Sequence, residues 1–263
     1  MALKVLIRIS LLLWLFTWST GLLVAQSQTE SIKLTAGVEI RGLVPVSFFT
    51  MDSVKLYEAD NNFNAVYSYT GGMGFGGVIR VKFTDLWNLE TGIYYTRRNF
   101  EFEVHDPSVG FNQSTSMSTV GYEIPLKGLV YIQMGKKIYM DVALGVSADF
   151  FASDTEVQRV SYNIQSFKNS WVTLAVLGSI GAEYRTEKDG YFYLGATFHQ
   201  PFGDTYSTQV NYYRDNQGMA YFQNGSIEGA YFSIDFKYLF PPKPPKKENV
   251  KRVIPNWKEM NRR

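Results

Sequence analysis

The sequence has 263 residues, of which 45% are hydrophobic, 16% aromatic and 19% charged, a composition that excludes a disordered chain and allows one large core. It contains no cysteine and two histidines, which excludes a disulfide framework and a thiolate metal site and leaves little for a histidine-based one. The net charge of +2 is unevenly distributed, because Lys4 and Arg8 contribute two positive charges and residues 241–263 six more, so that residues 26–240 carry −6.

Residues 1–25 have the pattern of a secretory signal peptide. Two basic residues precede an apolar run over positions 9–24, and small or polar residues follow. We expect cleavage after Ala25, or alternatively after Ser27, and therefore export of the chain. An uncleaved anchor helix is the alternative interpretation of this segment.

From residue 32 onward, apolar and polar residues alternate with a period of two, which is typical of β-strands. In the segment 137–150, for example, Val142 and Leu144 fall on one face while Asp141 and Asp149 fall on the other. The same alternation predicts eight strands, which lie within residues 32–44, 71–85, 87–100, 122–134, 137–150, 171–185, 191–202 and 229–240.

The connections between these segments alternate in length. Short connections lie around Asp85, around Gly135 and at residues 187–190, and each is short enough for a hairpin turn. The other connections are long and polar, at 46–69, 103–117, 152–168 and 200–226. This pattern predicts an all-β fold, an eight-stranded antiparallel up-and-down barrel over residues 26–240 with its short turns at one end and its long loops at the other.

The volume of such a barrel decides which face points outward. Eight strands enclose an interior just wide enough for side chains to fill, and the Ile, Leu, Val, Phe and Met of the apolar face would overfill it. We therefore expect the apolar face to contact lipid, where a mid-bilayer Arg or Lys costs about 2–4 kcal/mol. Aromatic residues near strand ends would form girdles at the membrane surfaces: Trp87, Tyr94, Tyr95, Trp171, Tyr184, Tyr191, Tyr193, Tyr238 and Phe240.

The opposite face carries small residues, tyrosines, seven acids and seven bases, which we expect to form a charge network in the lumen. Charges of both signs in a narrow interior tend to pair, because an unpaired buried ion is costly. This favours a filled lumen that conducts nothing larger than water or small ions. The predicted network consists of Glu39, Arg41, Arg80, Lys82, Glu90, Arg98, Glu123, Lys127, Asp141, Asp149, Glu183, Arg185, Asp235 and Lys237.

Three stretches resemble one known family. The run "YEIPLKGLVYIQMGKKIYMDVALGVSADF" at 122–150, with "WNLETGIYY" at 87–95 and "IGAEYR" at 180–185, resembles the outer-membrane β-barrel domains of the PorT type, which are abundant in Bacteroidota. The resemblance covers roughly residues 32–240 and implies a location in the outer membrane of a Gram-negative bacterium, with both ends of the mature chain in the periplasm. One role known in the family is assembly of a secretion system, and the family shares no catalytic motif.

Neither histidine belongs to a recognisable catalytic pattern. His105 lies in a predicted loop and His199 ends a strand, without a serine or carboxylate motif nearby in the sequence. The glycine-rich run at 70–77 lacks the Lys-Ser/Thr pair of a phosphate-binding loop and fits a strand that lets a narrow barrel bend. We expect no enzyme activity, no cofactor and no metal.

Alternation also continues within residues 207–225, beyond the predicted membrane span. One interpretation is a hairpin above the membrane that presents four aromatic side chains to a partner, and the other is a hairpin that packs against neighbouring loops. The four residues are Tyr212, Tyr213, Tyr221 and Phe222.

Residues 241–263 depart from the family pattern, in which the chain ends at the aromatic residue of the last strand. The "PPKPPKK" run favours an extended spacer of about 3.1 Å per residue, and Val253, Ile254, Trp257 and Lys258 beyond it would form a short docking motif. The alternative is a solvated basic tail drawn to anionic head groups or peptidoglycan.

These features predict a membrane-anchored scaffold or accessory subunit of an envelope complex. Its expected partners are outer-membrane lipid and a periplasmic or outer-membrane protein, and no nucleic acid. A small-solute channel is the first alternative, and a lipid-modifying enzyme is the second.

Overall fold

The computed structural model describes residues 33–46, 54–55, 63–84, 86–186, 188–214 and 219–241. The predicted signal peptide and the docking motif in the tail lie outside these residues. None of the described residues forms a helix long and apolar enough to cross a membrane.

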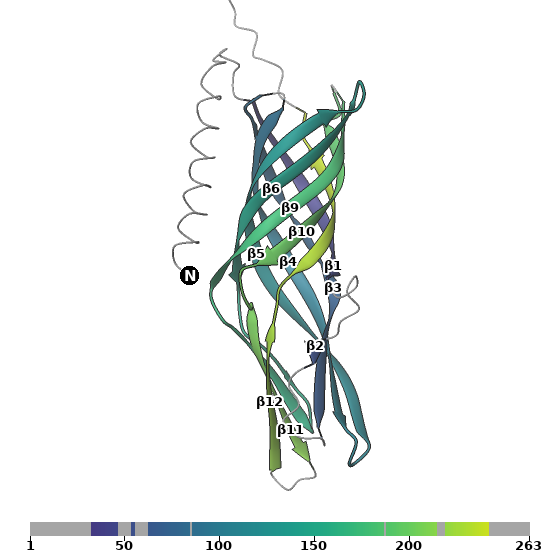
Figure 1. Ribbon diagram of the computed structural model, residues 1–263, viewed down its shortest axis with the longest axis vertical. Coiled ribbons are helices and arrows are strands. Elements are labelled where there is room, and N and C mark those ends of the chain that lie inside the picture. The colour runs from purple at the N-terminus through teal and green to yellow at the C-terminus, as the bar shows by residue number, and fades with distance from the viewer. Residues whose placement is uncertain are drawn as a thin grey trace, which may run out of the picture.

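Eight antiparallel strands form a closed ring (Figure 1). Each strand pairs with its neighbours in the order β1-β13-β10-β9-β6-β5-β4-β3, and β3 pairs in turn with β1. The predicted eight-stranded up-and-down barrel is therefore confirmed. The barrel strands are β1 (Lys33–Pro45), β3 (Asn64–Lys82), β4 (Trp87–Asp106), β5 (Phe111–Gln133), β6 (Ile138–Phe151), β9 (Val172–Arg185), β10 (Tyr191–Pro201) and β13 (Tyr231–Leu239).

The short turns lie at one end of the barrel. At the turn between β5 and β6, the amides of Met134 and Gly135 both donate to the carbonyl of Ile138, and the amide of Thr186 donates to the carbonyl of Gly190 at the turn between β9 and β10. Both the first residues of β1 and the last residues of β13 belong to this end, because an even number of antiparallel strands returns the chain to its starting side.

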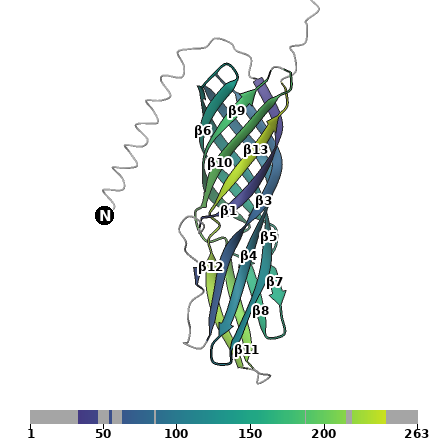
Figure 2. The ribbon, with the colours of Figure 1, turned by 90° about the vertical axis from the view of Figure 1, so that its right-hand side faces the viewer.

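The described parts of the long connections at the other end are mostly strands, although the sequence predicts only the hairpin within 207–225 and loops for the rest. β3, β4 and β5 continue past the barrel, with Asn64 opposite His105 and Asp106 opposite Phe111. A separate four-stranded sheet in the order β12-β11-β8-β7 faces them (Figure 2). We call the part of the molecule beyond the barrel the extension. It consists of the far ends of β3, β4 and β5 together with the further strands β7 (Thr155–Gln158), β8 (Tyr162–Lys168), β11 (Tyr206–Arg214), β12 (Met219–Ile227) and β2 (Val54–Lys55), which pairs with β3.

The extension has a hydrophobic interior, unlike the barrel. Aromatic side chains stack within it, as Phe63 does on Tyr212 with ring centroids 5.1 Å apart. The Tyr67 hydroxyl donates to the carbonyl of Ser226, and burial raises the pKa of Tyr67 to about 12, so the donor proton is retained at neutral pH. The core of the extension consists of Phe63, Ala65, Tyr67, Phe100, Phe102, Val104, Met117, Phe151, Tyr162, Ile164, Tyr206, Val210, Tyr212 and Ile227.

A bulge at Gly71 marks the passage of β3 from the extension into the barrel. The pairing with β4 shifts between Tyr69 and Gly71, and Gly71 has a φ of 115°, which favours glycine. The extra residue changes the side-chain parity, so that Tyr67 points inward on one side of the bulge and Arg80 on the other. The glycine-rich run at 70–77 thus lies in a strand, as its composition indicated.

The outer face of the barrel is apolar and exposed. Leu144 is 71% and Ile93 is 62% exposed, although both lie in the middle of long strands. The outward side chains of β6 run from Ile138 to Phe150, about 40 Å of strand, which at a tilt of about 45° gives a band about 28 Å tall. A transmembrane barrel needs an apolar band of roughly this height, about 25 Å.

Candidate functional site: the charged barrel lumen

The lumen holds the charged residues that the alternation placed on the polar face. Twelve of the fourteen are buried, and Lys82 and Arg185, which lie towards the short-turn end, are partly buried. Eight antiparallel strands aim alternate side chains inward, so residues far apart in the sequence meet across a narrow space. Along the barrel axis the network divides into a group around Glu183 at the short-turn end, a middle group around Glu90, and a third group around Glu123 nearest the extension.

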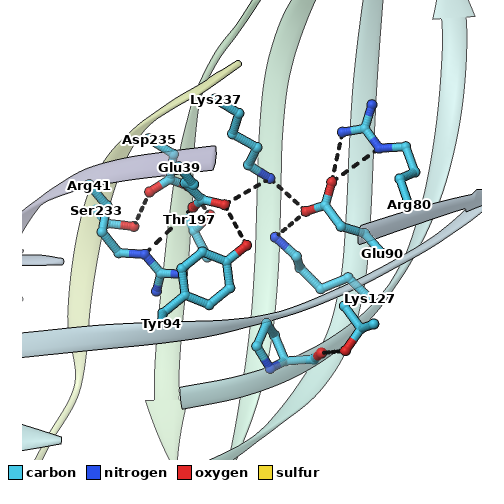
Figure 3. Close-up of polar contacts among 12 residues, drawn as sticks. Glu39, Arg41, Arg80, Glu90, Tyr94, Lys127, Thr197, Ser233, Asp235 and Lys237 are labelled. Atoms are coloured by element: carbon cyan, nitrogen blue, oxygen red, sulfur yellow. Dashed lines mark hydrogen bonds and ion pairs between the residues drawn. The ribbon is translucent and has the colours of Figure 1, made fainter. Parts of the chain in front are cut away.

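Glu90 on β4 is the centre of the middle group (Figure 3). Its carboxylate lies 2.6 Å from Lys237 Nζ, 2.9 Å from Lys127 Nζ and 2.7 Å from Arg80 Nη2. Lys237 also lies 3.6 Å from Glu39, which accepts a hydrogen bond of 2.6 Å from the Tyr94 hydroxyl. Carboxylates and bases therefore alternate across the lumen from β13 to β3.

Arg80 connects this group with the wall opposite β3. Its second guanidinium nitrogen, Nη1, pairs with Glu183 on β9, which is the fourth strand from β3 in either direction around the ring. Arg185 closes the short-turn end, because its Nε pairs with Glu183 and its guanidinium lies 3.9 Å from the centre of the Tyr139 ring.

Glu123 on β5 is the centre of the third group, nearest the extension. It accepts hydrogen bonds from Arg41 Nη1 at 2.8 Å and from Arg98 Nη2 at 3.2 Å. The Tyr231 hydroxyl, from the opposite wall, lies 2.8 Å from Glu123 Oε2. Arg41 also stacks over the Tyr94 ring at 3.9 Å, so the middle group and this group are in contact.

Three aspartates are not paired with an Arg or Lys among the described residues. Asp235 accepts hydrogen bonds from the hydroxyls of Thr197 and Ser233, and the Oδ2 of Asp141 has no hydrogen-bond partner. Asp149 accepts a hydrogen bond from Ser147 and lies beside His199. The three aspartates lie on β6 and β13, in the part of the wall formed by β6, β9, β10 and β13. Small side chains face the lumen there, such as Ala143, Ala175, Ser179 and Thr197.

His199 lies near the end of β10, as expected, but it has a carboxylate neighbour that no sequence motif indicated. The side chain is fully buried, its Nε2 lies 2.9 Å from Asp149 Oδ2, and its ring stacks on Tyr231. The sequence did not reveal this contact because β6 and β10 are not neighbours in the ring, and only the barrel geometry brings them together.

Two of the aromatic residues assigned to the membrane girdles also belong to the lumen. Tyr94 is 0% and Tyr193 is 1% exposed. Tyr94 lies against Gly76 on the neighbouring strand β3 and Gly92 on its own strand, and Tyr193 lies over Gly181 on β9 and Gly195 on its own strand. The shared parity of Tyr94 with Glu90 would have placed it inward, whereas Trp87 and Trp171, at 51% and 68% exposure, do lie on the outer face.

The hairpin of β11 and β12 packs mainly inward. Tyr212 is 2% exposed in the core of the extension, so it is not presented to a partner, while Tyr213 is 45% exposed. The backbones of Tyr221 and Phe222 pair with β11, and their side chains lie outside the described part of the structure, as do all four residues of the docking motif.

This fold defines a class, the transmembrane β-barrels, and the comparisons give the family. Residues 24–207 match the outer membrane protein beta-barrel domain, and the chain belongs to this family of outer-membrane proteins. No curated protein matches the sequence.

The comparison with solved structures finds outer-membrane proteins, of which OprG is similar in fold. The outer membrane protein OprG from Pseudomonas aeruginosa superposes with a TM-score of 0.51 and 12% identity, covering 81% of this chain and 97% of that chain. The outer membrane protease OmpT from Escherichia coli gives a TM-score of 0.35 and 10% identity, covering 82% of this chain and all of that chain (100%). At 12% identity the similarity to OprG concerns the fold alone.

Proposed function

We propose that the protein is a closed outer-membrane barrel that anchors the extension and acts as a scaffold or accessory subunit of an envelope complex. One observation carries the proposal: ion pairs cross the lumen from wall to wall, from Lys237 through Glu90 and Arg80 to Glu183. A solute could pass only if these contacts opened. Removing one partner of a buried ion pair typically costs about 3–5 kcal/mol, so an open state would be rarely populated.

The extension is the part that would meet a partner beyond the membrane. Its interior is packed with apolar and aromatic side chains, so it forms a stable body rather than a set of loops. Alternate residues of β4, such as Glu101 and Glu103, give its outer face a polar surface. By the general rule that outer-membrane barrels have short periplasmic turns, the extension would be extracellular and both chain ends periplasmic.

Planar-bilayer recording of the purified protein tests the closed lumen. We expect no stable conductance step from the wild type. The control is a variant in which Glu90, Lys127 and Lys237 are all replaced by alanine, which should conduct because the middle group is removed. A stable, solute-selective conductance in the wild type would overturn the proposal.

The second candidate, a small-solute channel, is favoured by the aspartates of the small-residue wall. Asp141 and Asp235 face the lumen where no described Arg or Lys pairs with them, so a passage there would prefer cations. In this case the wild type would show cation conductance that Asp141→Asn and Asp235→Asn reduce. Loss of selectivity in these variants would decide for the channel.

A lipid-modifying enzyme is less well supported by the geometry. The buried hydroxyl of Ser147 donates to Asp149 rather than to His199, so the imidazole does not activate this serine. Unchanged lipid A mass spectra in a deletion strain would agree with this interpretation.

We further propose that the chain is a PorT-type barrel of a Bacteroidota bacterium. This rests on the "EIPL" run in β5 and on the stretch 122–150, which continues from it into β6. We also propose that Val253, Ile254, Trp257 and Lys258 dock a periplasmic or outer-membrane protein. Affinity purification of the full chain and of a chain ending at Phe240 from native outer membranes tests the docking. Identical co-purifying proteins would exclude it.

A further inference from the structure

Three ionisable side chains converge at the end of the lumen that borders the extension. Glu123 of β5, Asp149 of β6 and His199 of β10 each place one ligand atom within 4.8 Å of the other two. They are 2%, 1% and 0% exposed. Glu123 and Asp149 lie directly opposite each other on the paired strands β5 and β6, and the curvature of the barrel brings His199, two strands beyond β6, to the same place.

The polar atoms of this cluster are not satisfied by the protein. Neither ring nitrogen of His199 makes a hydrogen bond, and the Oδ2 of Asp149 makes none, although both side chains are fully enclosed. The Nε2 of His199 lies 2.9 Å from this Oδ2, so the two atoms are close but not aligned as donor and acceptor. Buried polar groups almost always have a partner, and three unpaired atoms that face one another indicate a missing one.

We propose that Glu123, Asp149 and His199 bind a single divalent cation of the zinc type. Zinc takes imidazole nitrogen and carboxylate oxygen at about 2.0–2.2 Å in tetrahedral geometry, so two ligand atoms lie about 3.3–3.6 Å apart. The 2.9 Å from Nε2 to Oδ2 is shorter than this, so the two side chains would separate by a few tenths of an ångström when the ion enters. The imidazole ligand favours zinc over calcium or magnesium, which prefer sites made of oxygen.

The surroundings hold the three ligands in place. Ser147 donates a hydrogen bond of 2.7 Å to the other oxygen of Asp149, Oδ1. The Tyr231 ring stacks on His199 with centroids 4.5 Å apart, and the Tyr231 hydroxyl bonds to Glu123. Such outer contacts orient metal ligands in proteins and contribute to affinity.

The local charges leave room for a cation. Arg41 and Arg98 both pair with Glu123, and Glu39 lies near Arg41 and Lys237, whereas Asp149 has no Arg or Lys partner among the described residues. The charge of Asp149 is therefore the one that either a metal ion or a proton on His199 would compensate. A protonated His199 is the competing occupant, and the experiment must separate the two.

A bound ion would join three strands at the junction between barrel and extension. Phe151, which follows Asp149 on β6, already belongs to the core of the extension, and β10 ends at Pro201, shortly after His199. The ion would thus fix the base of the extension on the barrel, independently of whether the lumen conducts.

Metal binding can be measured on the full-length protein purified in detergent. After chelator treatment, the protein is dialysed against Zn²⁺ and its metal content is measured by inductively coupled plasma mass spectrometry. We expect one ion per chain, and a loss of affinity of at least tenfold in His199→Gln and in Asp149→Asn. The matched control is His105→Gln, since His105 is the other histidine and is exposed on β4.

A second measurement is made on the wild type, so it does not depend on whether the variants fold. X-ray absorption of the zinc-loaded wild type should show a mixed nitrogen and oxygen shell with one imidazole. The proposal is overturned if the wild type retains no ion, if H199Q binds as tightly as H105Q, or if nuclear magnetic resonance shows that His199 is protonated and unaffected by Zn²⁺.

Discussion

Glu90 is the residue on which the middle of the lumen depends. Its single carboxylate is in contact with Arg80, Lys127 and Lys237, and it is 0% exposed. No water replaces a lost partner cheaply at such a position. A substitution here therefore tests whether the ion pairs stabilise the barrel or only occupy its interior.

We expect Glu90→Gln to lower the free energy of unfolding by about 3–5 kcal/mol, because three bases lose their shared counter-charge while the shape is kept. Urea unfolding in lipid vesicles, followed by the heat-dependent mobility of the folded barrel on gels, measures the change. Glu103→Gln is the control, since Glu103 is exposed on the same strand, and should change stability by no more than about 0.5 kcal/mol. If E90Q unfolds at the same urea concentration as the wild type, the network has no structural role.

Two glycines of β9 differ in what surrounds them. A Cβ on Gly181 would overlap the Tyr193 ring inside the lumen, whereas a Cβ on Gly178 would lie 3.7 Å from Leu144 on the lipid face. We expect Gly181→Ala to destabilise the barrel by about 1–3 kcal/mol through overpacking, and Gly178→Ala to leave it unchanged or slightly more stable. The same unfolding assay compares the two variants; equal effects would mean that Tyr193 moves aside without cost.

At the scale of the element, β4 exchanges the character of its two faces part of the way along. Its inward residues change from Glu90 and Arg98 to Phe100 and Phe102, and its outward residues change from Ile93 to Glu101. The exchange occurs where the wall of the barrel becomes a wall of the extension. It marks the membrane boundary more directly than the aromatic residues do.

Because of this exchange, we expect the outward face of β4 to tolerate a lysine at one position and not at another. Ile93→Lys should cost about 2–4 kcal/mol, because a lysine would then face the middle of the bilayer. Glu101→Lys, on the same outward face of β4 but in the extension, should fold into vesicles as well as the wild type. The folded fraction in vesicles distinguishes them, and equal folding of both variants would show that the apolar band does not contact lipid.

The same strand shows how far the sequence predicts the fold. Period-two alternation and the number of short turns were sufficient for the eight barrel strands, since lipid on one side and charge on the other give a strong pattern. The extension was missed because the faces of β4 exchange beyond Arg98, so Phe100, Phe102 and Val104 continue the alternation with their apolar side turned inward. The contact of His199 with Asp149 depends on the curvature of the barrel across β9, which no local pattern contains.

At the scale of the whole molecule, two interiors of opposite character share β3, β4 and β5. The barrel is filled with ion pairs and surrounded by apolar side chains, while the extension is filled with apolar side chains and has a polar surface. The strands pass without interruption from one to the other, apart from the bulge at Gly71. The two parts are stabilised by different interactions, so a single substitution can address one of them.

We expect Phe102→Ala to open the extension and to leave the barrel folded. Phe102 is 0% exposed in the core of the extension, and its truncation creates a cavity that costs about 3–5 kcal/mol there. The ion pairs around Glu90 are untouched, so the heat-dependent mobility of the barrel should persist while protease cuts β7, β8, β11 and β12 in vesicles. Phe75→Ala on the lipid face is the control and should leave both parts resistant. Loss of barrel mobility in F102A would mean instead that the continuous strands couple the two interiors into one cooperative unit, and that the extension is needed for the barrel to remain closed.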